Sequence, residues 1–348
     1  MHQRTTSRVA NKVIRLGFIG CGGVANHHAR TIRQFVRGIV PAAAADISPT
    51  ALRAFGVEHG IAALYSDYRK MLREAAIDAV CVALPTGLHA QATLAAAHAG
   101  KHVFCEKPMA MSLHAADAMI AACREARVVL MIGHVRRYDN EWLTFRRLVH
   151  AGIIGRPVFW REAAGGAGRG GWFMDARLGG GPFLDKCVHN WDFANFVFGQ
   201  PCEALGSIMH LKKHSAADTG AVIVRYRSGD EIMVSTSWGL PSGCQAGGIH
   251  EALGPRGVIK FPRTFPESEL PAGFDREKYG AFLVDLGGTK RLVKFRRNNL
   301  FAAEWRDFLR ACRGEKAPEA HGAVGRQALA VGLAVVKAGK TRRPVRIT

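Results

Sequence analysis

Residues 13–25, VIRLGFIGCGGVA, join an apolar strand directly to a helix through a glycine-rich loop. In the pattern Gly20-x-Gly22-x-x-Ala25, the first glycine permits a tight turn and the second lets the backbone approach a pyrophosphate, while the alanine allows close helix–strand packing. The N-terminus of the helix then attracts the phosphates with its partial positive charge. A glycine-rich loop by itself is common and is weak evidence of function. This one lies between the first strand and the first helix, and that position predicts dinucleotide binding.

The region 12–135 continues this alternation of strands and helices. Continuous apolar strands separated by helices predict a parallel sheet covered on both faces, in a doubly wound Rossmann fold. Strands are expected at 13–20, 39–46, 78–85, 101–108 and 128–134. Helices are expected at 24–37, 49–60 and 89–100, and a further one is capped by Ser112.

Beyond residue 135 strands follow one another with few helices between them. We expect strands at 156–165, 218–226 and 230–238, and helices at 183–198, 300–313 and 324–338. Ser228-Gly229 joins the last two strands as a hairpin. The sequence therefore predicts an N-terminal Rossmann domain at 12–135 that binds NAD(P). A second, C-terminal α/β domain is expected at 136–348, with a mostly antiparallel sheet.

The composition restricts the partners and the compartment. The chain carries 48 Lys and Arg against 28 Asp and Glu, which raises nucleic acid as a partner. The basic residues are spread out without a recognition motif, so we expect no nucleic-acid partner and some attraction for small anions.

We find no apolar run long enough for a membrane span and interpret 13–20 as a strand, not part of a signal peptide. Eight cysteines without a C-x-x-C pair predict free thiols in a reducing, cytoplasmic setting.

Asp46 ends the second expected strand, where a carboxylate can bind the ribose hydroxyls. It would repel a 2′-phosphate, so the sequence favours NAD over NADP. Glu106 and Lys107 lie toward the carboxyl end of strand 101–108, at the edge where such sheets bind ligands. The predicted cofactor contacts are Gly20, Gly22, Gly23, Val24, Asp46, Ile47, Leu84, Pro85, Thr86, His89, Glu106 and Lys107.

Several segments together resemble the glucose–fructose oxidoreductase / inositol dehydrogenase (Gfo/Idh/MocA) family. Besides the glycine loop they are LPTGLHA (84–90), AGKHVFCEKP (99–108), GHVRRYD (133–139), GRP (155–157), GGGPFLDKCVH (179–189) and EWRDFL (304–309). The resemblance covers nearly the whole chain, and the set is specific where single members are not. It implies an NAD(P)-dependent enzyme acting on a secondary alcohol of a sugar, inositol or related ring. It also implies that the sheet of the C-terminal domain is large and open, that this domain binds substrate, and that a homodimer or homotetramer forms through this sheet.

By this resemblance, Lys107, Asp185 and His189 correspond to the family's catalytic lysine, aspartate and histidine. Pro108 corresponds to a proline that often follows a cis peptide. One departure is the loop Leu84-Pro85-Thr86-Gly87, where many relatives have Thr-Pro-Asn, so the cofactor contact of Thr86 is expected to differ.

Lysine, aspartate and histidine side chains are suited to the oxidation of an alcohol. When a hydride leaves a carbinol carbon the hydroxyl proton must leave as well, and histidine is a natural base near neutral pH. If 183–198 is a helix, Asp185 and His189 lie one turn apart on one face, where Asp185 orients the imidazole or binds a second hydroxyl. The Lys107 ammonium would stabilise the developing alkoxide. Whether His189 takes the proton alone or shares it with Lys107 stays open.

Arg137 and Trp172 are further candidates for substrate binding, although a surface arginine and a hydrophobic anchor explain them equally well. An isolated Asp-x-x-x-His is often a surface pair. A metal site of Asp185, His189 and Asp192 is disfavoured because Cys187 would point off that face, and we predict no metal. Two other functions stay open. One is an enzyme with tightly bound NAD that oxidises its substrate transiently for elimination, epimerisation or glycoside cleavage, and the other is a non-catalytic NAD-binding sensor.

Overall fold

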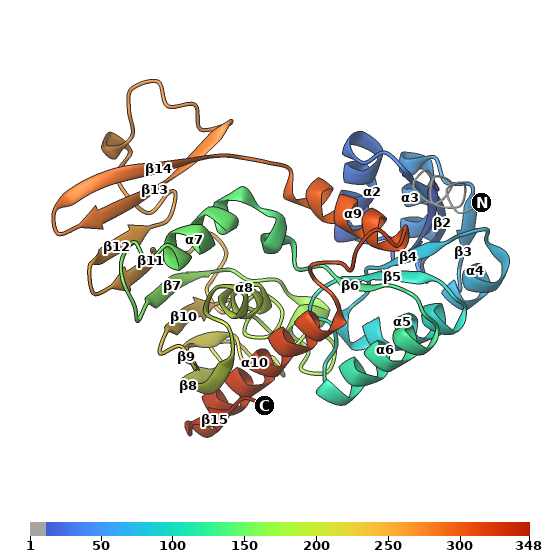
Figure 1. Cartoon of the computed structure of the whole chain (residues 1–348). Helices are drawn as coiled ribbons and strands as arrows, with labels where there is room; N and C mark the ends of the chain where they lie inside the picture. The colour runs from blue at the N-terminus through green and yellow to red at the C-terminus, as the bar shows by residue number, and fades with distance from the viewer. Residues whose placement is uncertain (1–11) are drawn as a thin grey trace. The chain divides into compact units, whose positions relative to one another are not determined.

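The computed structural model describes residues 12–348, which form two compact units. The first unit runs to Val135 and includes Asn299–Arg326, and the second contains Arg136–Asn298 and Gln327–Thr348. The sequence pattern placed 136–348 in one continuous domain, whereas 299–326 groups with the first unit because helix α9 (Leu300–Cys312) packs on helix α2 (Gly23–Phe35). Figure 1 shows the elements of each unit.

The first unit contains a six-stranded sheet whose strands all run parallel. Its order, β3-β2-β1-β4-β5-β6, is that of a Rossmann fold. The strands are β1 (Ile14–Ile19), β2 (Ile39–Ala45), β3 (Ala63–Tyr65), β4 (Ala79–Val82), β5 (His102–Cys105) and β6 (Leu130–Ile132). Besides α2 and α9, its helices are α3 (Pro49–His59), α4 (Tyr68–Glu74), α5 (His89–His98) and α6 (Leu113–Glu125). The parallel sheet and the expected helices are confirmed.

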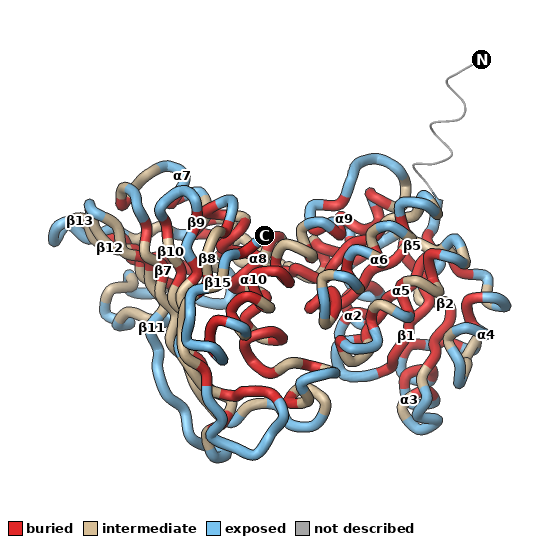
Figure 2. The backbone as a smooth tube through the Cα atoms, turned by 90° about the horizontal axis from the view of Figure 1, so that it is seen from below, coloured by how far each residue is buried: buried red, intermediate tan, exposed pale blue. Residues whose placement is uncertain are grey.

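Local signals explain why most of these elements were predictable. Ser48 caps α3 by accepting a hydrogen bond from the Ala51 N–H, Pro49 is its first residue, and Gly60 ends it in the left-handed conformation. In contrast, β3 and α4 were not expected from the sequence. Strand β3 has three residues, too few to show a period, and it is neither fully buried nor flanked by proline. Figure 2 shows that β1, by comparison, is largely buried.

The second unit contains a nine-stranded sheet of order β14-β13-β12-β11-β7-β10-β9-β8-β15. Neighbouring strands are antiparallel except for β7 and β10, so the predicted mostly antiparallel sheet is confirmed. The strands are β7 (Phe159–Gly166), β8 (Pro201–Met209), β9 (Thr219–Tyr226), β10 (Glu231–Ser237), β11 (Gln245–Gly254), β12 (Gly257–Lys260), β13 (Tyr279–Leu286), β14 (Thr289–Arg296) and β15 (Val345–Arg346).

Three helices accompany this sheet: α7 (Asn140–His150), α8 (Val188–Phe198) and α10 (Gly322–Thr341), whose first turn belongs to the first unit. Helix α8 is buried almost all round, as a core helix is. The expectation of a helix from 183 was wrong, because α8 begins at Val188. Residues before it form an irregular turn in which the N–H groups of both Lys186 and Cys187 donate to the carbonyl of Pro182.

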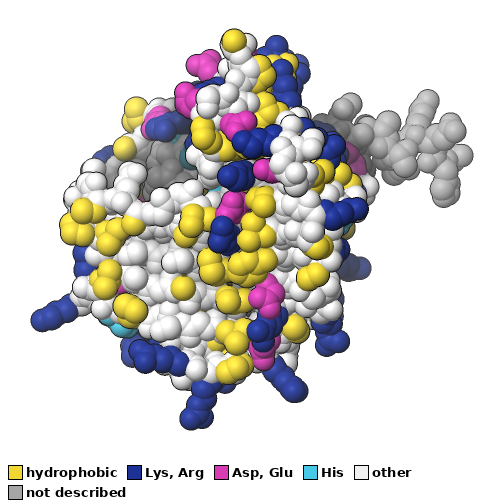
Figure 3. All heavy atoms as spheres, turned by 90° about the vertical axis from the view of Figure 1, so that its left-hand side faces the viewer, with side chains coloured by type: hydrophobic (Ala, Val, Ile, Leu, Met, Phe, Trp, Pro, Cys, Tyr) yellow, Lys and Arg dark blue, Asp and Glu magenta, His cyan; other side chains and the backbone are white. Residues whose placement is uncertain are grey.

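One face of the nine-stranded sheet carries side chains that are only partly buried. Along β10, Ile232, Val234 and Thr236 are buried while Met233 is half-buried, which is the alternation of a sheet with one covered face. Leu205, Ile223 and Met233 are paired across three strands of the less buried face. Figure 3 shows a surface on which hydrophobic side chains lie in the middle beside some Lys, Arg, Asp and Glu side chains, while further Lys and Arg side chains stand out along the lower edge.

Candidate active site

The glycine loop has the shape that the sequence predicts. Gly20 lies at φ +95°, and a Cβ there would stand 2.4 Å from the Ala83 carbonyl oxygen, so this position requires glycine. At Gly22 and Gly23 an added Cβ would meet nothing within 4 Å, so no protein atom accounts for glycine there. No side chain caps the N-terminus of α2. An open glycine loop before an uncapped helix N-terminus fits a bound pyrophosphate.

Asp46 follows β2 and is tied to this loop. Its Oδ2 accepts a hydrogen bond from the Cys21 N–H at 2.8 Å, and its Oδ1 accepts one from the Ser48 N–H, also at 2.8 Å. Ile47, beside it, is 92% exposed. A carboxylate oxygen accepts more than one hydrogen bond, so Asp46 can still receive ribose hydroxyls.

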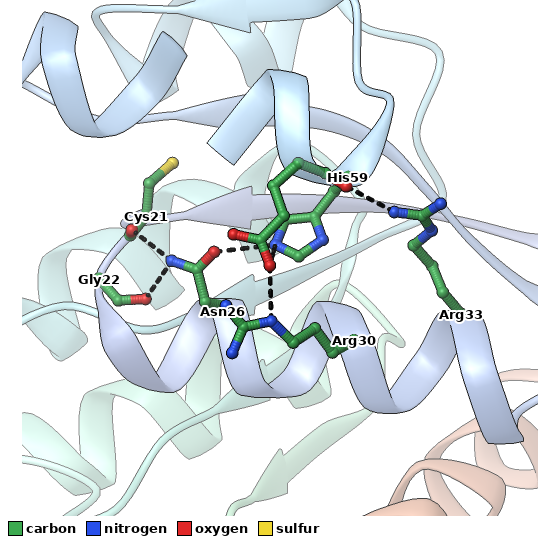
Figure 4. Close-up of polar contacts among 7 residues, drawn as sticks. Cys21, Gly22, Asn26, Arg30, Arg33 and His59 are labelled. Atoms are coloured by element: carbon green, nitrogen blue, oxygen red, sulfur yellow. Dashed lines mark hydrogen bonds and ion pairs between the residues drawn. The ribbon is translucent and has the colours of Figure 1, made fainter. Parts of the chain in front are cut away.

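Asn26, in the first turn of α2, and His59, the last residue of α3, hold the start of α2 in place. Asn26 donates to the carbonyls of Cys21 and Gly22, and its own oxygen lies 2.9 Å from His59 Nε2 (Figure 4). Burial lowers the pKa of His59. This network ties the glycine loop to the start of α2 and to α3.

His89 follows the short 3-10 turn Thr86–Leu88, which comes after Leu84 and Pro85. Its Nε2 lies 2.8 Å from the Leu84 carbonyl oxygen and its Nδ1 lies 2.9 Å from that of Pro108. Burial lowers the pKa of His89, and the contacts of its two ring nitrogens with these carbonyl oxygens oppose that effect. In this structure His89 therefore supports the backbone on which a cofactor would lie.

Glu106 and Lys107 come directly after β5, and the Lys107–Pro108 peptide is cis. Glu106 Oε1 lies 2.6 Å from His28 Nε2, and Oε2 accepts the Lys107 N–H at 3.1 Å. Burial acts to raise the pKa of Glu106, but the hydrogen bond from His28 and nearby positive charge outweigh it and lower that pKa. Glu106 is thus a buried carboxylate beside the proposed catalytic lysine. His28 carried no motif that would single it out in the sequence.

In the second unit, Asp185 lies in the turn before α8 and His189 is the second residue of that helix. Their neighbours anchor the segment to the sheet. Lys186 Nζ donates to Thr236 Oγ1 at 3.0 Å, and Asn190 Nδ2 donates to Glu162 Oε2 at 2.5 Å. Each anchor lies one residue beyond Asp185 or His189, so the backbone that carries these two residues is tied to the sheet.

Arg137 and Asp192 form a buried ion pair. Arg137 Nε lies 3.0 Å from both carboxylate oxygens, Nη2 lies 2.9 Å from Oδ1, and the guanidinium stacks on the Phe196 ring. Trp172 lies in the 3-10 turn Gly171–Met174 and stacks on Phe173 with ring centroids 3.7 Å apart. The roles of Arg137 and Trp172 toward a substrate stay predictions.

Residues 12–348 contain no group of three or more His, Cys, Asp or Glu side chains placed to hold a metal ion. None of the helices in this range is long and apolar enough to cross a membrane.

Known proteins resemble the chain along its length. Residues 14–134 match the model described as "Oxidoreductase family, NAD-binding Rossmann fold", and 142–260 match the GFO/IDH/MocA C-terminal domain. The chain is 28% identical to myo-inositol 2-dehydrogenase of Thermotoga maritima over 96% of its length and 98% of the relative. It is 31% identical to 1,5-anhydro-D-fructose reductase of Ensifer adhaerens over the same shares.

Among solved structures, levoglucosan dehydrogenase in complex with NADH superposes with a TM-score of 0.80 at 19% identity, covering 96% of this chain and 99% of that one. A probable dehydrogenase of Thermotoga maritima gives 0.75 at 26% identity, covering 96% and 99%. With both domain models matched in order, the chain belongs to the Gfo/Idh/MocA family of oxidoreductases, and its first unit is that family's NAD-binding Rossmann domain.

Proposed function

We propose that the protein is an NAD-dependent dehydrogenase that transfers a hydride between a secondary alcohol of a sugar, inositol or related polyhydroxy ring and nicotinamide. The relatives named above act on inositol and on an anhydro-sugar, and a structural neighbour acts on levoglucosan. The observation that carries the proposal is the presence of Lys107 just after β5, of Asp185 in the turn before α8 and of His189 in the first turn of that helix.

The residues of the first unit fit a nicotinamide dinucleotide. The open space over Gly22 and Gly23 would take the pyrophosphate, and Asp46 would take the ribose hydroxyls. A carboxylate at this point disfavours a 2′-phosphate by charge repulsion, and neither Ile47 nor Ser48 beside it supplies a positive charge. These features support NAD over NADP.

Bound NAD supplies the hydride acceptor, and the protein supplies the groups that handle the proton and the charge. In the proposal His189 takes the hydroxyl proton, since a neutral imidazole is a base suited to neutral pH. The Lys107 ammonium stabilises the alkoxide that forms as the proton leaves. Asp185 orients the imidazole or binds a second hydroxyl, and Arg137 and Trp172 would contact the rest of the substrate.

Two further features belong to the proposal. All eight cysteines are free thiols, which supports a reducing, cytoplasmic compartment. The row Leu205, Ile223 and Met233 on the less buried face of the nine-stranded sheet supports a homodimer or homotetramer formed through that sheet.

The test is a substrate panel of myo-inositol, scyllo-inositol, 1,5-anhydro-D-fructose and levoglucosan, followed by the absorbance of reduced nicotinamide, with NAD and NADP separately. We expect turnover with NAD that Lys107→Met abolishes and that the surface control Lys70→Met retains, since Lys70 makes only a 4.0 Å contact with Glu74. No turnover in either direction with any member would refute the proposal. Cofactor retained through purification, with turnover but no net NADH, would instead indicate the enzyme with transient oxidation.

A further inference from the structure

Three buried side chains of the first unit form a hydrogen-bonded chain that ends at Lys107. The Trp305 indole N–H donates to His28 Nδ1 at 2.9 Å, and His28 Nε2 lies 2.6 Å from Glu106 Oε1. The other oxygen of Glu106 accepts the backbone N–H of Lys107 at 3.1 Å. These residues come from α9, α2 and the end of β5, so the chain joins three segments that are far apart in the sequence.

The direction of every hydrogen bond in this chain is determined. An indole nitrogen only donates, so His28 Nδ1 must accept and carries no proton. His28 Nε2 therefore carries the proton and donates to the Glu106 carboxylate. One histidine tautomer satisfies both contacts and the other satisfies neither, because an Nδ1–H would face the indole N–H and a bare Nε2 would face a carboxylate oxygen.

The surroundings hold the three groups in place. His28 and Trp305 are fully buried and Glu106 is 8% exposed. Phe104 stacks on Trp305 with ring centroids 4.3 Å apart and meets the His28 ring edge-on at 5.3 Å. Behind the carboxylate, a Cβ added to Gly133 would lie 3.3 Å from its atoms, so the glycine leaves room for Glu106 and little else. A buried carboxylate in such a place is stable only while its hydrogen bonds are kept.

We propose that Trp305 and His28 are positioning residues that act through Glu106 to hold the backbone of Lys107 in its working position. This inference rests on the proposed role of Lys107. Neither residue is placed at the reacting atoms. Their effect is to fix the peptide from which the lysine side chain starts, and small displacements of a catalytic group reduce rates steeply.

The experiment compares Trp305→Phe, His28→Phe and His28→Gln with Lys107→Met. Phenylalanine at 305 keeps the stacking on Phe104 but removes the N–H donor. Glutamine at 28 retains one donor and one acceptor, whereas phenylalanine retains neither. The matched control is Phe301→Leu, which alters a ring 5.6 Å from His28 without removing a hydrogen bond. The readouts are kcat and KM with the best substrate of the panel, NADH affinity by fluorescence titration, and thermal stability.

We expect Trp305→Phe and His28→Phe to lower kcat by about 10- to 100-fold. NADH affinity should change less than kcat, because the glycine loop and Asp46 keep their contacts while only Glu106 and Lys107, among the predicted cofactor contacts, are affected. His28→Gln should recover most of the lost kcat, and Phe301→Leu should keep a wild-type kcat. Suppose that Lys107→Met abolishes turnover while Trp305→Phe and His28→Phe, which remove these hydrogen bonds, keep a kcat near that of the wild type. The positioning role is then refuted and the proposed function stands. If Lys107→Met itself is active, the proposed function fails first.

A readout independent of activity covers variants that fail to fold. The nitrogen-15 NMR spectrum of histidine-labelled wild-type protein reports which ring nitrogen of His28 carries the proton. We expect a protonated Nε2 and a bare, hydrogen-bonded Nδ1, with the Nδ1 signal moving in Trp305→Phe. The opposite tautomer, or an Nδ1 signal that does not respond to loss of the indole, would overturn the inference.

Discussion

His250 gives the second unit a dependence on pH that can be calculated. It lies on β11, its ring stacks on Phe261 with centroids 3.5 Å apart, and its Nε2 is 3.7 Å from Glu162 Oε2. Burial lowers its pKa from 6.5 to about 4, and the nearby charge of Glu162 only partly opposes that effect. The folded protein therefore keeps this imidazole neutral over a range of pH in which the unfolded chain protonates it.

Proton linkage gives the direction and the size of the change in stability that His250 causes. Between pH 6.5 and about 4 the unfolded chain binds a proton at this residue that the folded chain does not, so stability falls as the pH falls. Each unit of pKa corresponds to about 1.4 kcal/mol. On that scale the His250 contribution to the free energy of unfolding should drop by about 2.5 kcal/mol between about pH 7.5 and about pH 4.5.

His250→Phe removes the titrating group and retains an aromatic ring against Phe261. Urea unfolding followed by tryptophan fluorescence at a series of pH values gives the free energy of unfolding of both proteins. We expect the variant to lose less stability on acidification than the wild type, by about 2.5 kcal/mol. The exposed His98, changed to Gln, is the control and should leave the wild-type profile in place. Parallel profiles for wild type and His250→Phe would refute the reasoning.

Three other outcomes are expected. Asp46→Asn keeps the acceptor toward the Cys21 N–H but removes the charge, so the ratio of kcat/KM for NADP to that for NAD should rise by about 10-fold or more. Gly20→Ala should lower the melting temperature because φ is +95° there, whereas Gly22→Ala should leave it unchanged and weaken NADH binding in a fluorescence titration. Met233→Glu on the less buried sheet face should reduce the molar mass measured by light scattering to that of a smaller assembly, and an unchanged mass would argue against that interface.

The fold could be predicted in its main features because the decisive signals are local. Glycine turns, caps such as Ser48 and continuous apolar strands each act within a few residues, and together they specified the parallel sheet. The start of α8 could not be found in this way. Phe183 and Leu184 continue the apolar run toward the helix, yet the backbone there forms a turn closed on Pro182. An apolar run shows that a segment is buried and does not show where its helical hydrogen bonds begin.

Candidate residues of the site could be identified from the sequence only where they belong to short sequence motifs. Lys107 and His189 lie within such motifs, and their roles stay predictions. The residues that hold these segments were not found, because their partners are distant in sequence. Trp305 and His28 are 277 positions apart and meet only once α9 packs on α2. No periodicity or spacing links two residues at that separation.

The two units hold their proposed catalytic residues in a similar way. In the first, the buried Glu106 bonds to the backbone of Lys107, and in the second Glu162, on β7, bonds to Asn190, the residue after His189. In both, a carboxylate of low pKa fixes the segment through an atom other than the catalytic side chain. A segment fixed in this way keeps its backbone in one place, and the start of a catalytic side chain is then fixed as well. We expect loss of either carboxylate to act through the position of its segment and not through a charge at the reacting atoms.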